Sequence, residues 1–311
     1  MNDPDISVVV PVYNSASTLD RLIARTNSAL AGRLFDIWLV DDGSRDHSAQ
    51  EITRLCEVHK HVRGVVLFRN FGQASALMAG LAQATGRIII IMDDDLQNPP
   101  EDIPLLIAKL ANGYDYVFGH AAGCTHENIF RKSGSLVNFW LTEKILQKPK
   151  NLIPSSFLAM RAEIAREILR YDGPYPYIAG MLFRISDRGA SVPVKRLQRQ
   201  EGQSGYSWKA LVRLWLNGLT TFSIVPLRMA ILAGSFSALS GLAWMGFIIA
   251  RKLMDPRISM GWTSTVSFIL FFSGIQLLAM GVLGEYLGRM FMSVNHTPQY
   301  AIRQVLGGPR K

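Results

Sequence analysis

Three consecutive aspartates, Asp93, Asp94 and Asp95, directly follow an apolar run at 88–92. A strand that ends in three like charges is unstable unless a positive group lies beside them. If the strand continues through these residues, Asp93 and Asp95 face one side and Asp94 faces the other. Carboxylates that face one space, with the amide oxygen of Gln97 nearby, are typical ligands of Mg²⁺ or Mn²⁺. The sequence therefore predicts a divalent metal site formed by Asp93, Asp95 and Gln97.

An alternative is that these acids only interact with the positive end of the following helix. That helix is expected to open at Pro99 and Pro100, and its own Glu101 and Asp102 already suit the helix dipole. Three further acids exceed what capping requires. The metal site is therefore the favoured interpretation.

The residues around this cluster alternate apolar strands with helical patterns, which predicts an α/β fold. Such a pattern indicates a mostly parallel sheet with helices on both faces, in which ligands bind beyond the carboxyl ends of the strands. We expect strands at 6–13, 35–40, 63–68, 87–92 and 114–119, and helices at 17–30, 73–84, around 52–56 and after 99.

Polar clusters follow four of these strands. They read "PVYNS", "DDGSRD", "RNFGQ" and "DDDLQ", in chain order. Because parallel strands end at the same edge of a sheet, the four clusters should line one crevice.

The second half of the chain carries two long stretches without charged residues. Residues 229–250 and 258–284 contain no Asp, Glu, Lys or Arg, and each exceeds the roughly 20 residues needed to cross a bilayer. The alternative, two buried helices of a soluble core, is disfavoured because such runs are rare in soluble folds. We therefore expect two transmembrane helices.

The distribution of basic residues predicts the orientation of these spans. Six Lys or Arg residues lie at 195–228, four follow the second span and three lie between the spans. With no secretory signal at the start, this bias predicts cytoplasmic termini and an inner (cytoplasmic) membrane protein. The net charge of +9 comes without a nucleic-acid-binding motif, so anionic lipid is the expected partner and nucleic acid is not.

The segment at 208–222 places apolar residues at helical spacing, with Lys209 and Arg213 elsewhere. This pattern is typical of a helix that lies in the membrane surface. An ordinary core helix is the alternative.

Taken in order, the motifs "VVVPVYNSASTL", "LVDDGSRDHS", "RNFGQASALMAG" and "DDDLQNPPEDIP" resemble those of family-2 glycosyltransferases, whose nucleotide-sugar-binding fold is called GT-A. More narrowly, "GYSW", "PLRM", "GWTS" and "GIQLLAMGVLGEYLGRMF" are similar to the membrane-bound polyprenyl-phosphate glycosyltransferases. That group includes dolichyl-phosphate mannose synthases and the undecaprenyl-phosphate transferases of glucose and of aminoarabinose.

The resemblance implies roles for particular residues. Catalytic roles fall on Asp95, Arg131, Lys132 and Arg199, and the metal ligands are Asp93, Asp95 and Gln97. The acceptor phosphate is expected near Arg131, Ser133, Arg199, Ser204 and Tyr206. The nucleotide is expected at Pro11, Val12, Tyr13, Asp41, Asp42, Gly72, Gln73 and Asp94.

Three positions depart from the family pattern. Ser15 stands where glutamate is usual, Gly205 where lysine is common, and Asp94 where alanine is common. A phosphate-neutralising charge is therefore expected from Lys132 or Arg199.

The resemblance implies an inverting enzyme that moves a sugar from a nucleotide diphosphate, with uridine favoured, to a polyprenyl phosphate such as undecaprenyl phosphate. An ionised lipid phosphate is already a nucleophile, so the mechanism needs no general base. Alternatives are a non-catalytic nucleotide-sugar sensor or lipid-linked-sugar translocase, and a processive polysaccharide synthase, whose Q-x-x-R-W signature is absent. The transferred sugar is left open, and relatives suggest a homo-oligomer.

We expect four parts: a cytoplasmic GT-A domain at 1–205, interfacial amphipathic helices at 206–228, a two-helix transmembrane domain at 229–288 and a cytoplasmic C-terminal tail at 289–311.

Overall fold

The computed structural model describes residues 4–122, 149, 152–195, 225–254, 261–295 and 298–307. These residues form two compact units. One unit contains the described residues up to 195 together with 298–307, and the other contains 225–254 and 261–295. Most of the expected interfacial helix at 206–228 lies outside the described residues.

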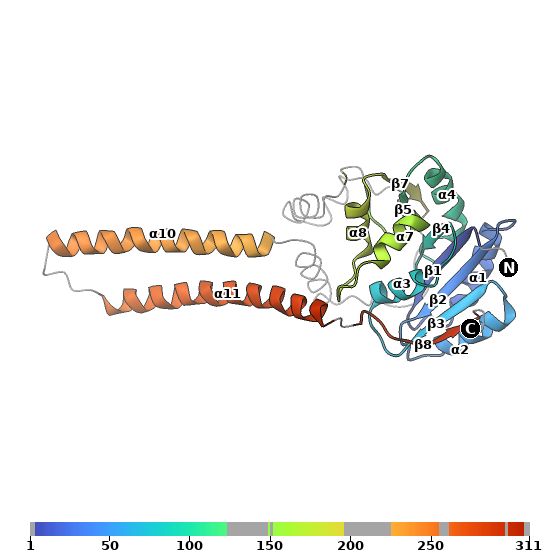
Figure 1. The fold of residues 1–311 in the computed structure, drawn as a ribbon, viewed down its shortest axis with the longest axis horizontal. Helices are drawn as coiled ribbons and strands as arrows, with labels where there is room; N and C mark the ends of the chain where they lie inside the picture. The colour runs from blue at the N-terminus through green and yellow to red at the C-terminus, as the bar shows by residue number, and fades with distance from the viewer. Residues whose placement is uncertain are drawn as a thin grey trace. The chain divides into compact units, whose positions relative to one another are not determined.

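The first unit is built on a mixed, mostly parallel sheet (Figure 1). Pairs β1–β2, β1–β4, β2–β3 and β5–β7 are parallel, whereas β6 runs antiparallel to β4 and β5, and β8 runs antiparallel to β3. The sheet order is β7-β5-β6-β4-β1-β2-β3-β8. The strands are β1 Ile6–Val12, β2 Phe35–Asp41, β3 Val62–Leu67, β4 Ile88–Ile91, β5 Tyr116–Ala121, β6 Leu158–Arg161, β7 Gly189–Val194 and β8 Ile302–Leu306. The expected α/β fold is confirmed.

Helices cover both faces of this sheet because alternate residues of each central strand point to opposite sides. Val8 and Val10 of β1 belong to one apolar core with residues of α1, α2 and α4. On the other face, Gly80 of α3 lies against Val9 and Val40. The helices are α1 Leu19–Ala29, α2 Ser48–Val58, α3 Gln73–Leu81, the 3-10 turn η1 Pro100–Asp102, α4 Ile103–Ala111, α7 Ala162–Leu169 and α8 Ile178–Ile185.

The segment after the second long helix is not a simple tail. Residues 302–306 form β8, which pairs with β3 at the edge of the sheet. Just before β8, the side-chain amide of Gln299 donates to the backbone carbonyl oxygens of Tyr171 and Gly173, each at 2.8 Å. Of the expected tail at 289–311, residues 289–294 therefore lie in α11, and residues 298–307 belong to the first unit.

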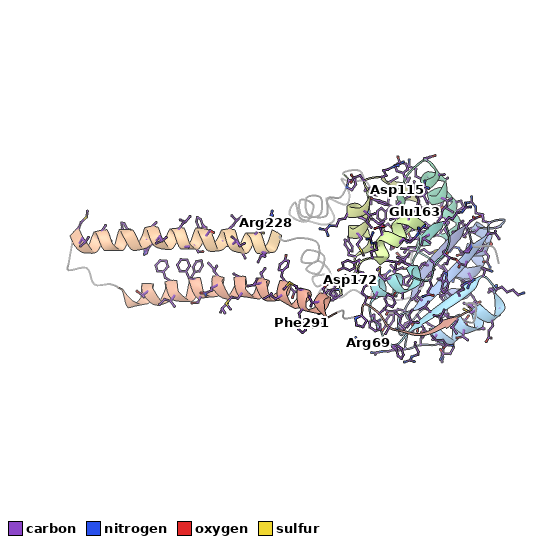
Figure 2. All side chains as sticks on the ribbon, in the orientation of Figure 1. Arg69, Asp115, Glu163, Asp172, Arg228 and Phe291 are labelled. Atoms are coloured by element: carbon purple, nitrogen blue, oxygen red, sulfur yellow. The ribbon has the colours of Figure 1, made fainter. Side chains whose placement is uncertain are left out.

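The second unit consists of two long helices, α10 Val225–Met254 and α11 Trp262–Val294. Each is long and apolar enough to cross a membrane, over Leu227–Trp244 and Phe271–Val294. Many of their apolar side chains are exposed, among them that of Phe291, which is labelled in Figure 2. The expectation of two membrane-spanning candidates is confirmed.

Candidate active site

The four polar loops that follow β1, β2, β3 and β4 lie at one edge of the sheet. These four strands are mutually parallel, so their carboxyl ends meet there. Pro11 and Val12 are buried at the end of β1, whereas the side chain of Tyr13 is exposed. The expected convergence of the four loops is therefore present.

The loops after β1 and β2 are joined by reciprocal hydrogen bonds. Asn14 adopts a positive φ of 54°. Its backbone N–H donates to Ser44 Oγ at 3.0 Å, and its side-chain oxygen accepts from the Arg45 N–H at 2.8 Å. Asp41 Oδ1 accepts from the Ser44 N–H at 3.1 Å. These bonds fix the turn that carries Tyr13.

Asp42 fastens the loop after β3 to the end of β2. Its carboxylate accepts from the backbone N–H of Phe71 at 2.7 Å and from that of Gly72 at 2.9 Å. Burial nevertheless raises the pKa of Asp42 to about 6. A Cβ at Gly43 would lie 2.4 Å from the backbone carbon of Arg69, so the two loops approach too closely for any side chain there. Asp42 thus shapes the loop at 71–73, and both of its oxygens are engaged by backbone donors.

The three aspartates do not alternate as a continued strand would. β4 ends at Ile91, before the cluster, and Leu96 has a positive φ of 58°. We expected Asp93 and Asp95 to face one side and Asp94 the other if the strand continued through them. That expectation is wrong, because the backbone has already left the extended conformation.

Each aspartate has its own set of partners. Asp93 accepts from the side-chain amide of Gln73 at 2.7 Å and from the hydroxyl of Ser156. Asp94 accepts from the Tyr13 N–H at 3.2 Å, and Asp95 accepts from the Gln97 N–H at 3.1 Å. The cluster therefore connects the loop after β4 with β1, with α3 and with the segment before β6.

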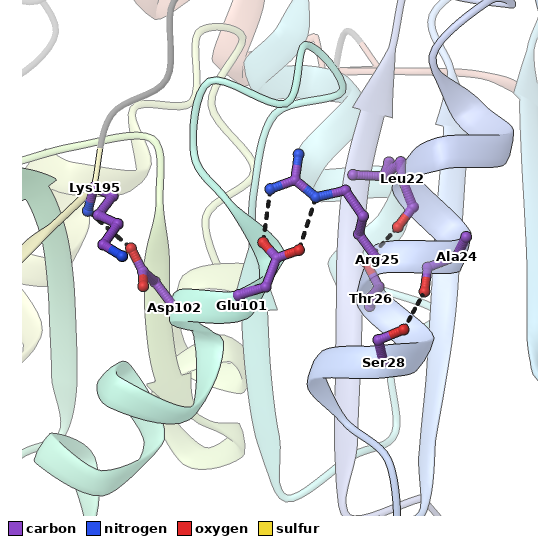
Figure 3. A network of polar contacts seen from close by, with 8 residues as sticks. All are labelled: Leu22, Ala24, Arg25, Thr26, Ser28, Glu101, Asp102 and Lys195. Carbon is purple, nitrogen blue, oxygen red and sulfur yellow. Dashed lines mark hydrogen bonds and ion pairs between the residues drawn. The ribbon is translucent and has the colours of Figure 1, made fainter.

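The far end of the loop after β4 is held by two further contacts (Figure 3). Glu101 forms a two-pronged ion pair with Arg25 of α1, with distances of 2.8 and 2.7 Å. Asp102 accepts from the Lys195 N–H at 2.8 Å. The α4 N-cap, Asp102, makes no side-chain capping bond. These acids join separate elements instead of capping their own helix.

The donor atoms at this edge suit a hard divalent cation that shares its coordination with phosphates. Among the residues that the structure describes, no three or more His, Cys, Asp or Glu side chains are placed to hold a metal by themselves. Mg²⁺ is commonly bound by one or two carboxylates, with substrate phosphates and water as further ligands. Asp93, Asp95 and Gln97 fit that donor set.

The residues expected at the nucleotide and metal lie in the loops at this sheet edge or at the adjoining ends of β1, β2 and α3. Arg131, Lys132, Ser133, Arg199, Ser204 and Tyr206 lie outside the described residues. Sequence reasoning missed Ser156, because "NLIPSSFLAMR" carries no pattern that marks a site. It also missed the linking role of Asn14 and Ser44, although both stand inside motifs that were singled out.

Residues 7–169 match the model of the family described as "Glycosyl transferase family 2". The chain belongs to this family. Two relatives from Klebsiella pneumoniae strains, each named undecaprenyl-phosphate 4-deoxy-4-formamido-L-arabinose transferase, are 37% identical over 98% of this chain and 94% of their own length.

A crystal structure of glucosyl-3-phosphoglycerate synthase from Mycobacterium tuberculosis, in complex with Mn²⁺ and uridine-diphosphate-glucose, is similar in fold. It is 20% identical, with a TM-score of 0.51, and the match covers 70% of this chain and 77% of that one. The GT-A fold is thereby confirmed.

Proposed function

We propose that this protein transfers a sugar from a nucleotide diphosphate, with uridine favoured, to a polyprenyl phosphate, with undecaprenyl phosphate favoured. The observation that carries the proposal is the convergence of Asp93 and Asp95 with the Asp42-held loop at one sheet edge, in a chain that also has two membrane-length helices. The names of the relatives support the lipid acceptor. The product would serve cell-envelope glycan or lipid A modification.

The donor is expected to lie across the four loops. Pro11, Val12 and Tyr13 would contact the nucleotide from the end of β1, and Asp41 would read its base or ribose. The loop at Gly72 and Gln73 would let backbone approach the nucleotide. Because Asp42 accepts from both Phe71 and Gly72, its contribution would be to hold that loop in place.

Asp93, Asp95 and Gln97 would hold Mg²⁺ or Mn²⁺, which would stabilise the charge of the departing nucleotide diphosphate. Gln73 and Ser156 orient the carboxylate of Asp93 through their hydrogen bonds. That carboxylate is thereby pre-positioned before any ligand arrives.

The acceptor needs no general base, because a phosphate monoester is largely ionised at neutral pH. One of its oxygens would attack the anomeric carbon while the bond from that carbon to the nucleotide diphosphate breaks, which inverts the configuration. Arg131, Lys132 and Arg199 would hold the two anions together against their repulsion. Ser133, Ser204 and Tyr206 would complete the acceptor site.

Transfer can be tested with the purified full chain in detergent, undecaprenyl phosphate and a panel of labelled nucleotide sugars. The first donor is the uridine-diphosphate form of 4-deoxy-4-formamido-L-arabinose, the sugar named for the relatives. Formation of a lipid-soluble labelled product supports the proposal. Nucleotide-sugar binding without transfer to any acceptor would instead support a sensor, and chain elongation would support a processive synthase.

Replacing Arg131, Lys132 or Arg199 with alanine should reduce turnover on the order of a hundredfold, as when a preorganised charge-stabilising group is removed. Turnover at saturating donor measures this effect. A carboxylate variant with normal donor and metal dependence but no turnover would reveal a general base and contradict the mechanism.

We further propose that α10 and α11 lie in the inner membrane, and that the residues before α10 and after α11 lie in the cytoplasm. Pairing of β8 with β3 joins residues from before α10 and after α11 in one sheet, so both flanks must share a side of any membrane that the helices cross. Cysteines at Ser259 or Gln304, in a background without Cys56 and Cys124, can be probed on intact cells with an impermeant thiol reagent. Labelling at 304 but not at 259 would reverse the orientation.

A homo-oligomer remains a prediction. Ser273, Gly274 and Gly281 of α11 offer small-residue surfaces where helices could approach closely. The mass of the detergent-solubilised particle, corrected for detergent, would test it.

A further inference from the structure

The turn at residues 13–15 bridges two loops through different hydrogen bonds. Asn14 and Ser15 donate their backbone N–H groups to Ser44 Oγ and Ser48 Oγ, each at 3.0 Å, in the segment after β2. Tyr13 instead donates its N–H to Oδ2 of Asp94, in the loop after β4, at 3.2 Å. The position of the turn relative to the aspartate cluster therefore depends on this carboxylate.

Ser15 meets the same carboxylate. Burial raises the pKa of Asp94, and the neighbouring side chain of Ser15 lowers it. The Ser15 hydroxyl donates to the carbonyl oxygen of Tyr13 at 3.2 Å. The turn thus offers Asp94 one backbone donor, the Tyr13 N–H, and places the Ser15 side chain beside the same carboxylate. Hydrogen bonds to charged groups are roughly twice as strong as those between neutral groups.

The contacts of Asp94 differ from those of its neighbours. Asp93 is oriented by Gln73 and Ser156, and Asp95 accepts from Gln97, within its own loop. Asp94 instead bonds to the turn after β1, at which Tyr13 presents an exposed ring. Asp94 is also half-buried, which suits a structural bridge.

We propose that Asp94 is a positioning residue, whose carboxylate holds the 13–15 turn in the shape in which Tyr13 contacts the nucleotide. In this proposal Asp94 does not contact the nucleotide itself, as the sequence had suggested. The kinetic measurements that test it rest on the proposed function. Since the side chain of residue 15 lies beside Asp94, a carboxylate presented from residue 15 should be able to substitute for that of Asp94.

The test is a double-mutant cycle in the full chain with Asp94→Ala, Ser15→Glu and the two combined. Asp94→Ala should raise the Kd for uridine diphosphate and the donor KM about tenfold or more, because it removes a charge-assisted bond to the turn. The kcat at saturating donor should stay within about twofold. Ser15→Glu alone should also weaken binding, since it sets a second carboxylate beside Asp94.

The combined variant should bind uridine diphosphate better than either single variant. Asp172→Ala, which removes an exposed carboxylate between α7 and α8, is the matched control and should bind like the unaltered chain. Asp94→Asn keeps an acceptor oxygen for the Tyr13 N–H and should lose less than Asp94→Ala.

Strictly additive effects in the cycle would overturn the proposal. So would an Asp94→Ala variant that loses kcat at unchanged KM, because Asp94 would then act in the chemistry or at the metal. Thermal melting without nucleotide supplies a measure that does not need the proposed function. If the unaltered chain neither binds uridine diphosphate nor transfers sugar, non-additivity in melting temperature still supports the bridge, and additivity there refutes it.

Discussion

Helices α3 and α10 are both apolar around their circumference, yet their surroundings are opposite. In α3, Ser75 to Leu81 are all buried between the sheet and its neighbours. In α10, Leu232 is 68% exposed and Phe236 is 73% exposed. A helix that is apolar on all sides belongs either inside a protein or inside a membrane. These two helices represent the two cases.

Length separates the two cases. The nine residues of α3 span roughly 14 Å, whereas the 30 residues of α10 span roughly 45 Å, more than the 30 Å or so of a hydrocarbon core. The first unit can therefore bury its apolar residues within itself and use its sheet edge for polar chemistry. The second unit needs lipid around it, and the exposed apolar surface of its helices is the reason.

The largest expected effect tests whether metal chemistry belongs only to the first unit. Asp95→Asn should remove most activity, a loss on the order of a hundredfold or more, because it deletes a charge that we propose faces the metal. The variant should still be extracted from membranes only by detergent, like the unaltered chain. Turnover with added Mg²⁺ or Mn²⁺, and with chelator, measures the effect, and full activity in chelator would contradict the metal assignment.

A smaller effect compares packing in the two units through glycine pairs. A Cβ at Gly80 would lie 2.5 Å from Val9 Cγ1 and 2.8 Å from Val40 Cγ2, so Gly80→Ala should destabilise the first unit by about 1–3 kcal/mol. Gly234 of α10 has no atom within 4 Å of an added Cβ, so Gly234→Ala is the matched control. Thermal melting in detergent tests the contrast. Equal melting temperatures for the two variants would mean that α3 is not tightly packed on the sheet.

An effect of similar size concerns the buried charge of Asp42. Its folded-state pKa of about 6 lies above the ordinary 3.8, so the folded chain binds this proton more tightly than the unfolded chain. Protonated Asp42 therefore adds about 1–3 kcal/mol to the free energy of unfolding. This contribution is complete below about pH 4 and is lost as the pH rises to about 6.

Asp42→Asn removes this titration. The melting temperature of the variant should therefore fall less between pH 4 and 7 than that of the unaltered chain. Parallel curves would show that Asp42 does not titrate in this range.

Much of the site could be predicted because its motifs are contiguous. "DDGS", "NFGQ" and "DDDLQ" each follow an apolar run, and parallel strands bring such loops to one edge. The partners of individual side chains could not be predicted in this way. Tyr13 and Asp94 are 81 residues apart in sequence numbering, yet the Tyr13 N–H donates to the Asp94 carboxylate at 3.2 Å.

Local sequence determined the strands β1 to β5, the helices between them and the two membrane-length helices, because periodicity and length are properties of contiguous residues. Only the tertiary structure decided that β6 enters the sheet between β4 and β5, and that β8 returns to β3 from beyond the second long helix. It also decided that Ser156 reaches Asp93. These pairings join segments far apart in the chain. They are made by backbone donors and acceptors that nearly every residue carries, so the residue types do not reveal which segments pair.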